Sequence, residues 1–91
     1  MSTPLETTRP MRSLIIVRAF WDAEARVWVA ESDDVPGLIT EAETIDALSD
    51  KLVVMIPELL EANNVEFALP EIPIHIMAER TARIVNPRSG A

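Results

Sequence analysis

Apolar residues along this chain fall into short extended runs and one helical stretch, and this pattern predicts where the secondary structure lies. We expect strands at Ser13–Phe20, Arg26–Ser32 and Gly37–Ala42, because β-branched and aromatic residues are typical of strands. A helix is expected from Thr44, and a last strand at about Ile74–Ile84. The helix is predicted from apolar residues at helical spacing: Ile45, Leu48, Leu52, Met55, Ile56 and Leu59.

The boundaries of these elements have their own residue signatures. Trp21–Ala25 is a polar stretch that we expect to be a hairpin loop, and Pro36-Gly37 suits a type II turn. Thr44 is a candidate N-cap. Pro57 removes a helical hydrogen bond, so we expect a kink there, and Asn63-Asn64 offers a residue that tolerates the left-handed conformation at the helix end.

The order of elements, β-β-β-α-β, predicts an α+β fold. The first three strands would form an antiparallel meander, and a right-handed crossover through the helix makes the fourth strand parallel to the first, in sheet order 3-2-1-4. Pro73 at the start of the last strand favours an edge position. We expect a single domain at residues 13–85 between flexible tails at residues 1–12 and 86–91.

The strands do not alternate cleanly between apolar and polar residues. One helix covers one face of a four-stranded sheet, yet Leu14–Val17 and Val27–Ala30 place apolar side chains on both faces. Val53 and Val54, with Leu60, also widen the apolar part of the helix beyond one stripe. Exposed apolar surface of this extent marks interfaces, so we expect a homo-oligomer, most simply a two-fold dimer.

Composition narrows the function classes. The net charge is −7, from 15 acidic and 8 basic residues, which disfavours direct nucleic-acid binding and favours a basic protein partner. The alternative is that the charge only maintains solubility. There is no cysteine, in keeping with a cytoplasmic protein, and we find neither a secretion signal nor an apolar run long enough to span a membrane.

Residues that carry catalysis are scarce, so we expect no enzyme, no cofactor and no metal. The chain has no Cys and no Tyr, its two glycines cannot form a phosphate-binding loop, and the role of its only histidine, His75, stays open. A metal-dependent nuclease needs convergent carboxylates, but the first strand carries Arg18 and no acid. The acidic residues between Asp33 and Asp46 surround a turn and a helix start, which favours a solvated rim.

The segment Val27–Ala42, VWVAESDDVPGLITEA, followed by a helix from Thr44, resembles the HicB-like antitoxins over about residues 14–85. The sequence of this segment is most similar to a small bacterial family of unknown function that is related to the HicB-like antitoxins. The resemblance implies a partial ribonuclease-H-like fold and binding to a small basic HicA-like toxin that cuts messenger RNA. Many relatives add a C-terminal DNA-binding segment, and the seven residues after Ile84 are too few for one.

Two function hypotheses follow. The first is a non-catalytic antitoxin-type module that neutralises a toxin without its own DNA-binding segment. The alternative is a free-standing homo-oligomer with no toxin partner, in a structural or small-molecule-binding role. The candidate partner-binding residues are an acidic rim, Glu31, Asp33, Asp34, Glu41 and Glu43, and the aromatic residue Trp21. The alternative role for Trp21 is packing over the hairpin. Charge reversal at Asp33 and Asp34 is expected to slow association with the partner.

Overall fold

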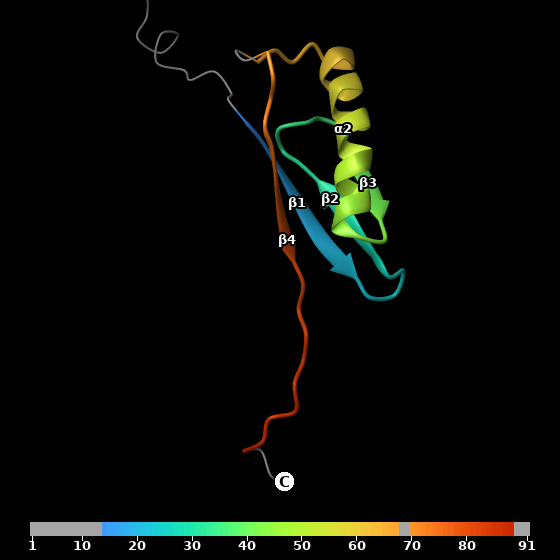
Figure 1. Cartoon of the computed structure of the whole chain (residues 1–91), viewed down its shortest axis with the longest axis vertical. Helices are drawn as coiled ribbons and strands as arrows, with labels where there is room; N and C mark the ends of the chain where they lie inside the picture. The colour runs from blue at the N-terminus through green and yellow to red at the C-terminus, as the bar shows by residue number, and fades with distance from the viewer. Residues whose placement is uncertain (1–13, 68–69, 89–91) are drawn as a thin grey trace, which may run out of the picture.

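The computed structural model describes residues 14–67 and 70–88, and they form one mixed sheet with a helix packed against it (Figure 1). The elements are β1 (Ile15–Asp22), β2 (Val27–Glu31), β3 (Ile39–Ala42), α2 (Ile45–Ala62) and β4 (Ile74–Glu79). The strand order is β3-β2-β1-β4. The predicted α+β fold and its order 3-2-1-4 are confirmed.

β1 is an inner strand and is paired on both sides. It runs antiparallel to β2, with Phe20 opposite Val29, and parallel to β4, with Val17 opposite Ile76. β3 extends the sheet beyond β2 by antiparallel pairing. The α2 crossover returns the chain so that β4 becomes an edge strand, as the proline before it predicts.

The hairpin between β1 and β2 is shorter than the sequence suggested. Trp21 belongs to β1 and pairs with Trp28, so the predicted loop start at Trp21 is wrong. The turn closes at Asp22, whose Oδ1 accepts the N–H groups of Glu24 and Ala25 at 3.0 and 3.1 Å. These side-chain bonds close the turn, so the β1–β2 pairing continues to Asp22 at the end of β1. Hydrophobic periodicity in the sequence does not predict them. Ser13, the predicted first residue of this strand, lies outside the described residues.

The Pro36-Gly37 turn has the predicted type II features. Gly37 has φ +82°, and the Leu38 N–H donates to the Val35 carbonyl at 3.1 Å. The turn carries two side chains into the core, because Val35 is fully buried and Leu38 is 3% exposed. It therefore fixes the connection between β2 and β3 by packing as well as by backbone geometry.

Both ends of α2 are capped. The Thr44 hydroxyl accepts the Ala47 N–H at 3.0 Å, which confirms the predicted N-cap. At the other end, Asn64 has φ +55° and the Val65 N–H donates to the Leu60 carbonyl at 3.0 Å, the arrangement of a Schellman motif. The helix is continuous through Pro57.

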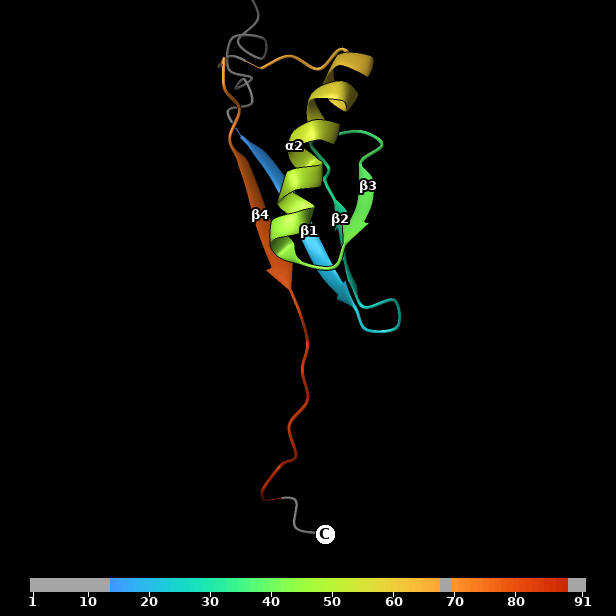
Figure 2. The same ribbon diagram turned by 45° about the vertical axis from the view of Figure 1, so that its right-hand side comes forward.

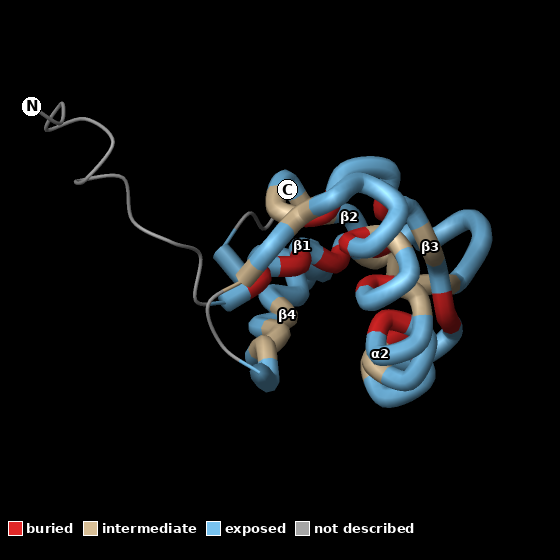
Figure 3. Tube along the Cα trace, turned by 90° about the horizontal axis from the view of Figure 1, so that it is seen from above, coloured by how far each residue is buried: buried red, intermediate tan, exposed pale blue. Residues whose placement is uncertain are grey.

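The core lies between α2 and one face of the sheet (Figures 2 and 3). Alternate β1 residues are buried, and every fourth residue of the helix from Leu48 to Leu60 meets them. Leu60, predicted to lie outside the main apolar stripe, is part of this core. The buried residues are Ile15, Val17, Ala19, Ala30, Val35, Leu38, Ala42, Leu48, Leu52, Ile56 and Leu60.

β4 ends at Glu79, five residues short of the predicted end at Ile84. Its last pair is Glu79 with Phe20, and the residues that follow Glu79 leave β1 although β1 itself continues to Asp22. Residues 80–88 continue away from the sheet, and all of them are exposed (Figure 1). Among the described residues, we find no helix with the length and apolar character to span a membrane.

Candidate interaction surface

α2 leaves one face of the sheet uncovered, and we call it the helix-free face. β1 side chains alternate, so Ile16, Arg18 and Phe20 point away from the helix. Residues that pair directly across neighbouring strands lie on the same face of the sheet. The residues of the other strands that pair with Ile16, Arg18 and Phe20, directly or through β2, therefore lie on the helix-free face. From β2, β3 and β4 these are Val29, Glu31, Ile39, Glu41, His75, Met77 and Glu79.

The helix-free face has a large apolar component. Phe20 is 37% exposed and Ile16 is 42% exposed, although both lie in an inner strand. Met77 on β4 is 50% exposed and Ile39 on β3 is 74% exposed. These side chains reach from one edge of the sheet to the other, with half-buried Val29 beside Phe20. The prediction of apolar residues on both sheet faces is therefore confirmed.

The charged groups of this face are mostly acidic. Arg18 is the one basic residue at these strand positions, and its Nη2 lies 3.5 Å from both Glu31 Oε1 and Asp33 Oδ2. Both contacts are long and exposed, with 93% of the Asp33 side chain accessible, so they neutralise the carboxylates only weakly. Glu41 and Glu79 add further negative charge on either side of the Val29–Phe20 pair.

Asp34, another member of the predicted acidic rim, has a structural role. Its Oδ2 accepts the Ile16 N–H at 2.9 Å, and its own N–H donates to the Ser32 hydroxyl at 3.1 Å. The Ser32 hydroxyl in turn donates to the Ile16 carbonyl. Two side chains thus take the place of a strand beside Ile16, where β2 pairing has already ended. A hollow of about 250 Å³ lies at this point of the surface.

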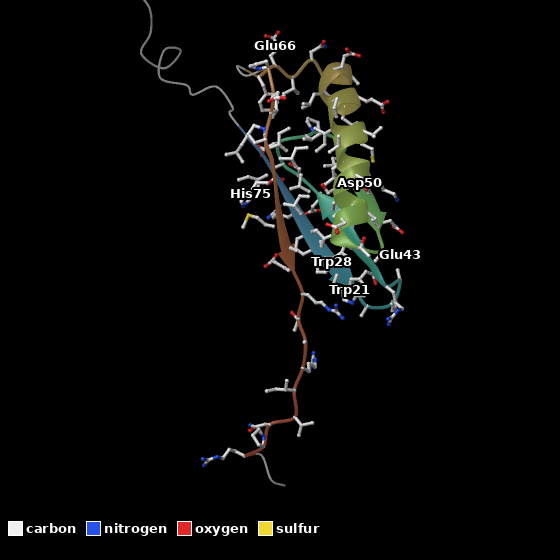
Figure 4. The ribbon with its side chains drawn as sticks, viewed as in Figure 1. Trp21, Trp28, Glu43, Asp50, Glu66 and His75 are labelled. Carbon is white, nitrogen blue, oxygen red and sulfur yellow. The ribbon has the colours of Figure 1, made fainter. Side chains whose placement is uncertain are left out.

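Glu43 lies just before the start of the helix (Figure 4). It follows the end of β3, whereas Glu31 pairs with Ile39 at the start of β3. Glu43 lines a shallow depression of about 390 Å³ together with Glu41, Val27 and Lys51. Lys51 Nζ donates to the Glu41 carbonyl at 2.6 Å, which places a cation next to these carboxylates. The structure therefore divides the predicted rim into two groups at different ends of the β2–β3 pair.

Trp21 lies on the other side of the sheet from the acidic strand residues. Its ring meets the Trp28 ring edge to face, with centroids 5.4 Å apart (Figure 4). The Arg80 guanidinium lies 4.6 Å from the centre of the Trp21 ring. Packing over the hairpin, the alternative role considered for Trp21, accounts for these contacts. Arg80 was not among the predicted residues, since no local pattern links it to a residue so distant in the chain.

Potential catalytic groups remain dispersed. His75 is exposed on β4 opposite Ile16, and no carboxylate hydrogen bond to it is present among the described contacts. Within residues 14–67 and 70–88, no three His, Asp or Glu side chains are grouped closely enough to hold a metal ion. The feature that distinguishes this surface is therefore its mixture of apolar and acidic side chains.

Comparison with known families gives a match over nearly the whole described region. The model of a domain of unknown function, DUF1902, matches residues 14–86. The chain belongs to the DUF1902 family. A solved structure of a hypothetical protein, TTHA1013 from the extremely thermophilic bacterium Thermus thermophilus, is 56% identical, covers 80% of this chain and 99% of its own, and has a TM-score of 0.60. No curated protein matches this DUF1902 chain.

Proposed function

We propose that this DUF1902 protein is a non-catalytic, antitoxin-type binding module related to the HicB-like antitoxins. In this proposal it acts in the cytoplasm, where it binds a small basic toxin that cuts messenger RNA and blocks its action. The observation that carries the proposal is the helix-free face, where exposed apolar side chains such as Phe20 and Met77 stand among carboxylates.

The composition of this face suits a small basic protein. Apolar side chains at the centre of an interface supply area that is removed from water, while the surrounding charges select and orient the partner. Glu31, Asp33, Glu41 and Glu79 outnumber Arg18, and the contacts of Arg18 are too exposed to cancel them. Such a surface attracts a basic partner and repels nucleic acid.

The test is purification of the tagged protein from its own cells, followed by mass spectrometry and a ribonuclease assay. We expect a small basic chain at near-unit stoichiometry, with an RNA-cleaving activity that this protein inhibits when added back in equimolar amount. A Glu41→Lys variant should recover less of that chain, whereas Glu58→Lys, with the same charge change on exposed helix surface, should recover as much as the wild type. Equal recovery by both variants, or a partner whose activity is unaffected, would contradict the proposal.

The free-standing homo-oligomer is the second candidate function. It is favoured by apolar groups outside the helix-free face, since Ile84 and Val85 are 88% and 89% exposed. Recovery of the protein alone from its own cells would favour this candidate. Self-association and toxin binding are compatible, provided that they use different surfaces.

A further inference from the structure

Residues 80–86 form an extended segment beyond β4, which we call the C-terminal arm. The arm leaves the sheet in line with β4 and makes no ladder with any strand in residues 14–67 and 70–88 (Figure 1). Its two large apolar residues, Ile84 and Val85, are almost fully exposed. Exposed apolar side chains on an extended segment favour its pairing with another surface.

The arm is not built to fold back on β4 of its own chain. A tight hairpin needs residues with positive φ or a proline turn, usually Gly, Asn or Asp. The stretch from Ile74 to Val85 contains no Gly, Asn, Asp or Pro. The residues with positive φ all lie elsewhere in the described chain, at Arg26, Gly37 and Asn64. β4 and the arm therefore act as one long extended strand.

The outer edge of β4 lies beside an apolar groove. The groove has a volume of about 360 Å³ and lies between the second half of α2 and residues 70–74, at the start of β4. Val53 of α2 and Ile74 of β4 both line this groove, and Val53 is 59% exposed. Among the strands that the structure describes, β4 pairs only with β1, and none of them pairs with its other edge.

Alternation along β4 determines which arm residues would reach such a groove. Ile74 and Ile76 point to the helix side, so in a continuous strand Ile84 points to the same side and Val85 to the opposite side. If two copies pair antiparallel through β4 and the arm, a register centred on Glu79 places Ile84 opposite Ile74 of the second copy, and Ile74 lines the groove. Ile84 would then lie beside the groove.

Charge also favours a second copy as the occupant. Three of the eight basic residues, Arg80, Arg83 and Arg88, lie in the arm or just after it, and none of the fifteen acidic residues does. The arm is thus basic and the rest of the chain strongly acidic. The Arg80 guanidinium lies over the Trp21 ring, so the first residue of the arm contacts β1 of its own chain.

We propose that two copies of this chain exchange their C-terminal arms, each arm adding to the β4 edge of the other copy and inserting Ile84 into its α2–β4 groove. The result is a two-fold dimer with one continuous sheet. This arrangement leaves the helix-free face accessible, so the inference does not depend on the proposed toxin partner.

Sedimentation equilibrium of the full chain tests the proposal through two matched pairs of variants. The wild type should form a dimer of twice the 10.1 kDa chain mass at micromolar concentration. Ile84→Asp should raise the dimer dissociation constant at least about tenfold, because it places an unpaired charge in an apolar groove. Val85→Asp, the same change on the other side of the arm, should have an effect below about threefold.

The second pair tests the groove. Val53→Asp should weaken the dimer as Ile84→Asp does, while Val54→Asp, equally exposed but outside the groove, should not. All four side chains are exposed in the single chain, so circular dichroism should show each variant folded. A monomeric wild type, or equal effects within either pair, would overturn the proposal. That result leaves the toxin-binding proposal standing, because Ile84 and Val53 lie outside the helix-free face.

Discussion

Asp34 Oδ2 accepts the backbone N–H of Ile16 at 2.9 Å, and this bond continues the edge of the sheet past the end of β2. Asp34→Ala removes this exposed hydrogen bond, so we expect a loss of about 0.5–1.5 kcal/mol in unfolding free energy. Asp34→Asn should lose less, because its amide oxygen can still accept. Urea unfolding measures both, with Asp33→Ala as the control, since the Asp33 side chain is 93% exposed. A similar loss at both positions would contradict the structural role of Asp34.

This role changes how the acidic surface should be tested. The sequence alone suggests charge reversal at Asp33 and Asp34 together. Because Asp34 holds the Ile16 backbone, reversal there would alter folding and binding together. Asp33 and Glu41 are the better pair, since neither carboxylate supports the backbone in the contacts described.

The turn at Gly37 offers a backbone test. Gly37 has φ +82°, and an added Cβ would lie 3.9 Å from Leu59 Cδ2, which is ordinary contact. Gly37→Ala therefore costs conformational energy without a clash, and we expect about 1–2 kcal/mol lower unfolding free energy. Gly37→Asn should recover part of this, because Asn tolerates the left-handed region better. Equal stability of the wild type and Gly37→Ala in urea would contradict the assigned turn.

The N-cap of α2 is expected to stabilise the helix through one hydrogen bond. Thr44→Ala removes the oxygen that accepts the Ala47 N–H at 3.0 Å and should cost about 1 kcal/mol. Thr44→Ser keeps that oxygen and should stay near the wild type. Thermal denaturation compares the two, and equal melting temperatures for Thr44→Ala and Thr44→Ser would argue against the cap.

Leu52 tests where the core lies. Its side chain is fully buried between the helix and the sheet, so Leu52→Ala should lower the unfolding free energy by about 3–5 kcal/mol. Val54 is two residues along the same helix and 62% exposed, so Val54→Ala should change it by less than about 0.5 kcal/mol. A small effect at Leu52 would mean that α2 packs through another face.

Local chemistry made much of the fold predictable from sequence. The Pro36-Gly37 turn, the Thr44 cap and the left-handed residue at Asn64 each depend on one or two residue types and were placed correctly. The end of β4 was not, because extended residues count as a strand only where they pair, and the pairing of β4 with β1 stops at Phe20 and Glu79. Long-range contacts such as Trp21 with Arg80 leave no local pattern.

The candidate site was predictable in composition but only partly in arrangement. Apolar residues on both sheet faces and an acidic region were foreseen, and Glu31 and Glu41 do lie on the helix-free face. The separation of Glu43 and the backbone role of Asp34 follow from register and turn geometry, which residue type does not specify. Phe20, Met77 and Glu79 join this face only through strand pairing.

The most direct measurement is the association rate with the basic chain that co-purifies, taken at two salt concentrations. Asp33→Lys with Glu41→Lys should slow association about tenfold and flatten its salt dependence, because the acidic field that steers the partner is lost. Glu58→Lys with Asp50→Lys, the same charge change on exposed helix positions, should retain most of the wild-type rate. An unchanged rate for the first variant would contradict the assignment of the helix-free face as the binding surface.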